Sequence, residues 1–166
     1  MYPTKSDTIL NNLIFLSIRV KRFDLSPAVL SVIAAEMFFR GSLHRMVEYC
    51  TWVALWFINA KRVETLSVGI AQIQLKRWVE LGYICSLAPT ISNLKAVFSV
   101  DNNYAACHRY LAHLSFSELS DPKQLSKVYS GRARIFHVNV IDSALSAAGK
   151  ISLTKASSRR AKGARG

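Results

Sequence analysis

The stretch PAVLSVIAAEMFF, residues 27–39, decides the fold, because it is almost entirely apolar and opens on a clear helix signal. Ser26 suits the N-cap position, and Pro27 suits the first helical position, where its missing N–H costs nothing. Gly41 then supplies a stop signal. Together these residues predict a helix from Pro27 to about Arg40.

Glu36 is the unusual residue of this stretch, since it is the only charged side chain among aliphatic and aromatic neighbours. Loss of hydration disfavours the charged form of a carboxyl group and raises its pKa. A carboxylic acid that keeps its proton near neutral pH can act as the general acid that cleaves a glycosidic bond. The alternative interpretation is a solvent-facing Glu36 that pairs with Arg40 one helical turn later.

The rest of the chain is also predominantly helical. Apolar spacing and cap residues predict helices over about 7–20, 43–60, 75–81, 90–98, 102–116 and 135–148, with a new helix start within 117–124. Residues 61–74 differ, because Thr, Ser, Val and Ile recur there and Gly69 interrupts them, so we expect a loop or a short hairpin. The predicted fold is mainly α, a single compact helical domain over residues 1–149.

Basic residues concentrate at the C-terminal end. The net charge is +12, and residues 150–166 carry six Lys or Arg side chains and no acidic residue. Such a segment predicts a disordered, solvated tail. It would be attracted to polyanions such as nucleic acid, anionic lipid or the acidic polymers of a bacterial envelope.

Length and composition narrow the class of protein further. A chain of 166 residues with 51% hydrophobic content can bury the core of one domain. No apolar run reaches the roughly 18 residues of a membrane span, so we expect no integral membrane segment. The N-terminus lacks the small-residue cleavage site of a secretory signal peptide.

The cysteines and histidines carry no metal signature. Cys50, Cys85 and Cys107 are widely spaced and form no CxxC pair, and the four histidines lack metal-ligand spacing. We therefore expect buried thiols that act as small hydrophobic side chains, with no metal and no cofactor.

Three motifs follow one another in order: Glu36 in its apolar helix, Gly69-Ile70-Ala71-Gln72-Ile73, and Tyr129-Ser130-Gly131. In this order they resemble the lysozyme-like superfamily, especially soluble lytic transglycosylases and goose-type lysozymes. In those families a catalytic Glu closes a core helix, and motifs similar to G-L-M-Q-I and Y-N-G follow it. The chain departs from the pattern at Ala71, where the family has Met, and at Ser130, where it has Asn.

The resemblance implies a lysozyme-like fold, with helices and at most a small hairpin, and cleavage of peptidoglycan glycan strands. By this resemblance Glu36 is the general acid. Gln72 offers an amide to sugar hydroxyls or N-acetyl groups, Gly69 lets the backbone approach the saccharide, and Tyr129 holds the carboxyl group or the substrate in line. The remaining candidate substrate-binding residues are Ser67, Ile73 and Trp78, of which Trp78 is the best candidate for a cleft wall.

A second carboxylate would decide the route of the reaction. Glu64, just before the central motif, is the favoured auxiliary catalytic residue. Glu48 is interpreted more simply, as one half of a surface pair with His44. The transglycosylases that the chain resembles use a single Glu as acid and then base, so hydrolase and transglycosylase both stay open.

Two other classes of function compete with the enzyme. One is a basic helical module that binds nucleic acid through the tail and through Lys76 and Arg77, although no helix-turn-helix pattern is visible. The other is a membrane-surface protein. The preferred hypothesis remains an enzyme that acts on peptidoglycan at the bacterial cell envelope, by an export route that the sequence does not identify.

Overall fold

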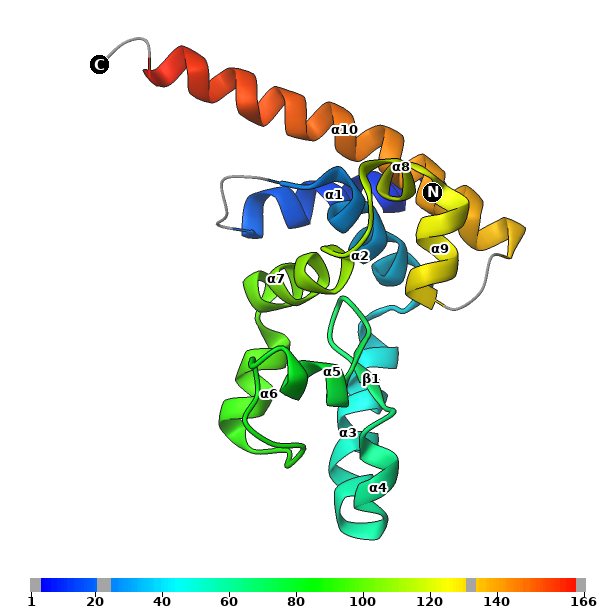
Figure 1. Cartoon of the computed structure of the whole chain (residues 1–166), viewed down its shortest axis with the longest axis vertical. Coiled ribbons are helices and arrows are strands. Elements are labelled where there is room, and N and C mark those ends of the chain that lie inside the picture. The colour runs from blue at the N-terminus through cyan, green and yellow to red at the C-terminus, as the bar shows by residue number, and fades with distance from the viewer. Residues whose placement is uncertain (1–3, 21–24, 131–133, 164–166) are drawn as a thin grey trace. The chain divides into compact units, whose positions relative to one another are not determined.

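The computed structural model describes residues 4–20, 25–130 and 134–163, without the side chains of Ser130 and of residues 152–163. Figure 1 shows that helices dominate these residues. The one sheet among them has two short antiparallel strands. The predicted mainly α fold with one small hairpin is therefore confirmed.

The elements follow one another without a repeat. In chain order they are α1 (Lys5–Arg19), α2 (Pro27–Phe39), α3 (Ser42–Ile58), α4 (Ala60–Val63), β1 (Ser67–Val68), β2 (Ile73–Gln74), α5 (Leu75–Glu80), α6 (Ile91–Phe98), α7 (Val100–Leu111), α8 (Phe116–Ser120), α9 (Pro122–Ser130) and α10 (Ile135–Gly163).

The chain forms two compact units. Unit 1 comprises Met1–Ala35 and Leu114–Gly166, and unit 2 comprises Glu36–His113. The boundary between the units falls within α2, between Ala35 and Glu36. The residue contacts of the chain therefore form two groups, one within each unit. The division at residue 149 into one folded domain and a tail stays a prediction.

Unit 1 is built around α1 and α10, which pack against each other, while α9 packs against α10 and α8. The N-terminus of α1 is closed by a capping box, in which Thr4 accepts the backbone N–H of Asp7 and Asp7 accepts that of Thr4. Ile9, Leu13 and Leu16 follow at helical spacing and are all buried. The spacing of apolar residues thus fixes which face of α1 packs.

The helix end predicted at Ala148 is wrong, because α10 continues to Gly163. One glycine in a helix interior costs only about 1 kcal/mol relative to alanine, and Gly149 is preceded by two alanines that favour the helix. A single Gly is therefore too weak to stop a long helix. The expectation that residues 150–166 act as a polyanion-binding tail stays a prediction.

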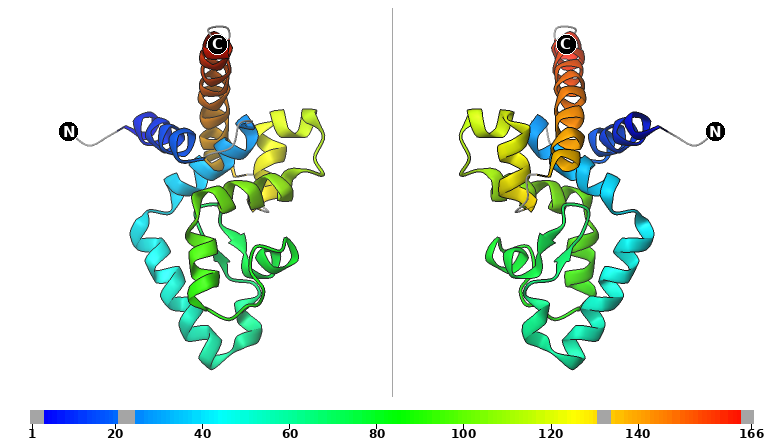
Figure 2. Two further views of the ribbon diagram at one scale, coloured as in Figure 1. Left: turned by 90° about the vertical axis from the view of Figure 1, so that its left-hand side faces the viewer. Right: turned by 90° about the vertical axis from the view of Figure 1, so that its right-hand side faces the viewer.

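Unit 2 is built around α3, which packs against α4 and β1, with α6 packed against α7 (Figure 2). The hairpin pairs Val68 with Ile73 and Ser67 with Gln74. It lies within residues 61–74, where the sequence predicts a loop or short hairpin. That prediction is confirmed for residues 64–74 and wrong for residues 61–63, which belong to α4.

The face that α3 buries is not its most apolar one. Its buried residues are Glu48 and Trp52, and the Trp52 Nε1 donates to the Leu87 carbonyl at 2.8 Å. By contrast, Val47 and Phe57 are 57% and 81% exposed. The more apolar face of α3 is therefore exposed, which is the reverse of the usual amphipathic pattern.

Two expectations from composition have different outcomes. Cys107 is buried as expected, whereas Cys50 and Cys85 are exposed, so the prediction of three buried thiols is wrong for two of them. Within the described ranges, no helix has both the length and the apolar character needed to cross a membrane.

Candidate functional site

The central motif forms the tight turn between β1 and β2. The Gln72 N–H donates to the Gly69 carbonyl at 3.3 Å and closes the turn. Gly69 has φ of 81° and Gln72 has φ of 52°, both in the left-handed region. For a non-glycine residue this conformation costs about 1–3 kcal/mol, so contacts elsewhere must hold Gln72 in place.

Asn103 on α7 holds this turn from one side. Its Oδ1 accepts the Ala71 N–H at 3.1 Å, and its Nδ2 donates to the carbonyls of Val97 (2.6 Å) and Ser99 (2.8 Å). A Cβ built at Gly69 would collide with the same Asn103 oxygen. Glycine is therefore required at position 69 both for its φ and for the close approach of α7.

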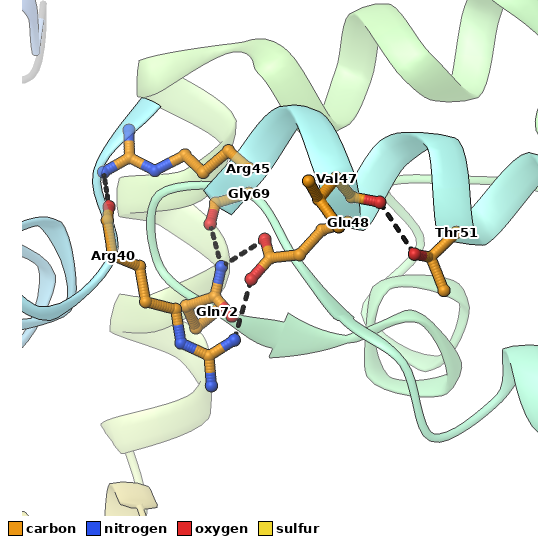
Figure 3. Close-up of polar contacts among 7 residues, drawn as sticks. All are labelled: Arg40, Arg45, Val47, Glu48, Thr51, Gly69 and Gln72. Atoms are coloured by element: carbon orange, nitrogen blue, oxygen red, sulfur yellow. Dashed lines mark hydrogen bonds and ion pairs between the residues drawn. The ribbon is translucent and has the colours of Figure 1, made fainter. Parts of the chain in front are cut away.

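The Gln72 side chain connects the turn to α3 (Figure 3). Its Nε2 donates to Glu48 Oε2 and to the Gly69 carbonyl, both at 2.8 Å. These two bonds settle the orientation of the amide, because the opposite orientation would set its oxygen against two other acceptors. The Gln72 Oε1 is buried and has no hydrogen-bond partner, so it can still accept one.

Glu48 is the carboxylate at the centre of this cluster. Its Oε1 pairs with Arg40 Nη1 at 2.7 Å, and its Oε2 accepts from Gln72, so each oxygen has one donor. The Glu48 side chain is 9% exposed, whereas that of Arg40 is 41% exposed. A carboxylate this buried needs such partners, because burying an unpaired charge is costly.

Two further ionisable groups of α3 surround Glu48, and Arg45 is the first. Burial lowers the pKa of Arg45, while Tyr49 and Glu48 raise it to a smaller extent. The Arg45 Nη2 donates to the Arg40 carbonyl at 3.0 Å, which ties the end of α2 to the start of α3.

Tyr49 is the second of these groups. Burial, with a smaller contribution from Glu48, raises the pKa of Tyr49 to about 12, against the lowering effects of Arg45 and of a backbone hydrogen bond from Gly69. The Tyr49 ring lies on Phe98, with ring centroids 4.2 Å apart. Tyr49 is therefore a neutral phenol beside the turn at neutral pH.

The predicted catalytic carboxylates are placed differently from each other. Glu36 is buried, with 8% exposed, so the alternative of a solvent-facing Glu36 is wrong. Arg40, its proposed surface partner, pairs with Glu48. Glu64 is exposed, and its backbone carbonyl accepts the Lys76 N–H at 3.1 Å. The structure thus brings Glu48, and not Glu64, to the central motif.

The other predicted site residues have mixed positions. Ser67 is half-buried in β1, and Ile73 is buried in β2. Trp78, expected at a cleft wall, is fully buried, with its ring edge-on to Tyr83 and 5.8 Å from it, so it is a core residue. Tyr129 is half-buried in α9, which belongs to unit 1.

Sequence reasoning undervalued Glu48, and the interpretation as a surface pair with His44 is wrong. The signal in the sequence was its spacing from Trp52, four residues later, which places both on one face of α3. Its partners, however, are distant in sequence: Arg40 lies 8 residues before Glu48, and Gln72 lies 24 residues after it. Only the tertiary fold brings these groups together.

The described residues contain no group of three or more His, Cys, Asp or Glu side chains that could hold a metal ion. The cluster consists of one carboxylate with arginine, glutamine and tyrosine, which are groups that hold and orient a proton-transferring or charge-stabilising carboxyl group. No protein-family model, curated protein or solved structure matches this chain.

Proposed function

We propose that unit 2 cleaves peptidoglycan glycan strands and that Glu48, not Glu36 or Glu64, is the carboxyl group at the reacting centre. The observation that carries the proposal is the hydrogen bond between Gln72 Nε2 and Glu48 Oε2. Gln72 belongs to the motif by which the chain resembles lytic transglycosylases and goose-type lysozymes. A buried carboxylate fixed to that motif is the arrangement that glycoside cleavage needs.

The chemistry has two requirements, a proton for the leaving oxygen and stabilisation of an oxocarbenium-like centre. A carboxyl group that is held in place through both of its oxygens can meet both requirements without reorganising during the reaction. In this proposal Glu48 first takes up a proton from solvent, donates it to the leaving oxygen, and then takes one back from the attacking hydroxyl group, as the single Glu of the transglycosylases does.

The basic character of the chain supports the choice of an envelope substrate. A net charge of +12 favours accumulation on the anionic polymers of a bacterial wall and accelerates encounter with them. The proposed place of action is therefore the cell envelope, with peptidoglycan as the partner.

Isosteric variants test the assignment, with released muropeptides measured by mass spectrometry after incubation with purified peptidoglycan. Glu48→Gln is expected to lower release by at least about 100-fold, the contribution of one acid–base group. Glu64→Gln is the matched control and is expected to keep the wild-type rate, because that side chain is exposed. Wild-type release by Glu48→Gln would contradict its role, and no release by the wild type would contradict the proposed activity.

Glu36→Gln decides between the two buried carboxyl groups. Under the proposal it changes stability more than rate, so its thermal unfolding is measured beside its activity. If Glu36→Gln loses activity while Glu48→Gln keeps it, the acid is Glu36, as the sequence predicts. The product mass also separates the two routes, because a transglycosylase leaves a 1,6-anhydro end and a hydrolase leaves a hydrated one.

A further inference from the structure

Helix α1 carries apolar side chains on two sides, and one of these sides is exposed. The buried side, which packs within unit 1, consists of Ile9, Leu13 and Leu16. The exposed side is a stripe with exposed fractions between 39% and 74%, and it consists of Leu10, Ile14, Phe15 and Ile18. Positions 10, 14 and 18 are four residues apart, so they form one row along the helix. A continuous row of exposed apolar side chains marks an interaction surface more often than scattered ones do.

Basic side chains lie at both ends of this stripe. At one end the Arg19 guanidinium lies over the Phe15 ring, 5.8 Å from its centroid. At the other end Leu10 lines a hollow of about 420 Å³ between α1 and α10, and Lys150 lines the same hollow. The stripe is therefore an apolar surface with a positively charged border.

The sequence around the stripe is also basic. It contains no acidic residue between Asp7 and Asp24, and Lys21 and Arg22 follow the end of α1. The Asp7 carboxylate is held in the capping box by Thr4. Unit 1 contains 14 of the 22 Lys and Arg residues and 5 of the 10 Asp and Glu residues, a net charge of +9. A partner that covers the stripe must therefore be both apolar and negatively charged.

We propose that α1 binds an anionic membrane surface, with the stripe among the acyl chains nearest the headgroups and the basic residues on the lipid phosphates. Nucleic acid or an acidic wall polymer would match the charge but would leave the stripe in water. A second copy would cover the stripe but would bring together two chains of net charge +12. An anionic lipid surface satisfies both requirements, and the inference does not depend on glycan cleavage.

Co-sedimentation with large vesicles measures this binding without peptidoglycan. The wild type is expected to bind phosphatidylglycerol vesicles at low salt and to bind phosphatidylcholine vesicles at least about tenfold more weakly, because only the first lipid is anionic. Binding to phosphatidylglycerol should weaken as salt screens the charges. A wild type that does not bind phosphatidylglycerol at low salt would overturn the proposal.

Ile18→Ser tests the apolar stripe. Ile18 is 74% exposed, so the substitution removes apolar surface without opening a cavity. It is expected to weaken binding to phosphatidylglycerol at least about fivefold, because less apolar area leaves water on binding. Ile91→Ser is the matched control, since Ile91 lies in unit 2 and is also 74% exposed, and it is expected to bind as the wild type does. Equal weakening by both substitutions would show that the stripe is not the membrane-binding surface.

Arg19→Gln tests the charged border. It is expected to weaken binding to phosphatidylglycerol about fivefold, the effect of one basic residue next to an anionic surface, and to leave binding to phosphatidylcholine unchanged. Arg62→Gln changes the net charge equally at an exposed position of α4 in unit 2, and it is expected to have a smaller effect. The same loss for both variants would mean that only the total charge matters, against a binding site on α1.

Two further outcomes would identify another partner and overturn the proposal. If the wild type binds duplex DNA and no phosphatidylglycerol vesicles, the basic surface serves nucleic acid. If sedimentation equilibrium shows a wild-type oligomer that Ile18→Ser converts to a monomer, the stripe is an interface between copies of this chain.

Discussion

At the residue scale, the central motif shows how one position can be fixed for two separate reasons. Gly69 is required for its positive φ and also for its contact with Asn103, and the second reason is invisible in the sequence because Asn103 lies 34 residues later. Gln72 tolerates an unfavourable backbone conformation because its side chain holds Glu48. Strain of this kind gathers at functional sites, which is consistent with the proposed role of the cluster.

Gly69→Ala is expected to lower the free energy of unfolding by more than the roughly 1–3 kcal/mol of backbone strain, since the new Cβ also collides with Asn103. Gly82→Ala is the matched control. Gly82 has φ of 75°, but a Cβ there meets nothing within 4 Å, so it measures the backbone cost alone. Urea denaturation of both variants gives the comparison. Equal reductions would mean that Asn103 moves aside without cost.

Tyr49 predicts a loss of stability in alkali. Its pKa is raised from 10.0 to about 12 in the folded chain, so the folded state keeps a proton that the unfolded state has released. The stabilising contribution is therefore complete below pH 10 and disappears as pH rises toward about 12. The measurement is the free energy of unfolding of wild type and Tyr49→Phe across this window. The free energy of unfolding of the wild type should fall with pH relative to that of Tyr49→Phe, and parallel curves would contradict the raised pKa.

At the element scale, local signals predicted where helices lie better than which way they face. Ser26 and Pro27 placed the start of α2, and Gly82 the end of α5, because capping depends on the adjacent few residues. The hairpin was predicted from its Gly-interrupted, β-branched sequence. Gly149 led to a wrong helix end, because the free energy that one glycine costs a helix is small compared with the helix propensity of the residues around it.

The orientation of α3 could not be predicted, because the sequence offers two usable faces. Its apolar stripe has the helical period that normally marks a buried face, yet the structure buries Glu48 and Trp52 instead. A periodicity signal identifies a helix that needs a partner, but it does not say whether the partner is the same chain or another one. For the same reason the sequence undervalues Glu48, since an ordinary amphipathic α3 would place that carboxylate on the surface.

At the scale of the whole molecule, the main feature is the positive net charge of the chain. The net charge is +12, and residues 150–166 hold six of the basic residues in a segment without acids. Because α10 continues to Gly163, most of this basic segment is helical.

This arrangement predicts that binding to duplex DNA, used as a model polyanion, depends on salt chiefly through the end of α10. Changing Lys155, Arg159, Arg160 and Lys162 to Gln lowers the net charge from +12 to +8 without shortening the helix that packs against α1. Each phosphate interaction removed in this way should reduce the slope of log K against log salt by about 0.9. The control variant changes Lys61, Arg62, Lys123 and Lys127 to Gln and has the same net charge. These four residues are exposed and lie outside α10. Equal slopes for both variants would show that only the total charge matters, and would contradict a binding segment in α10.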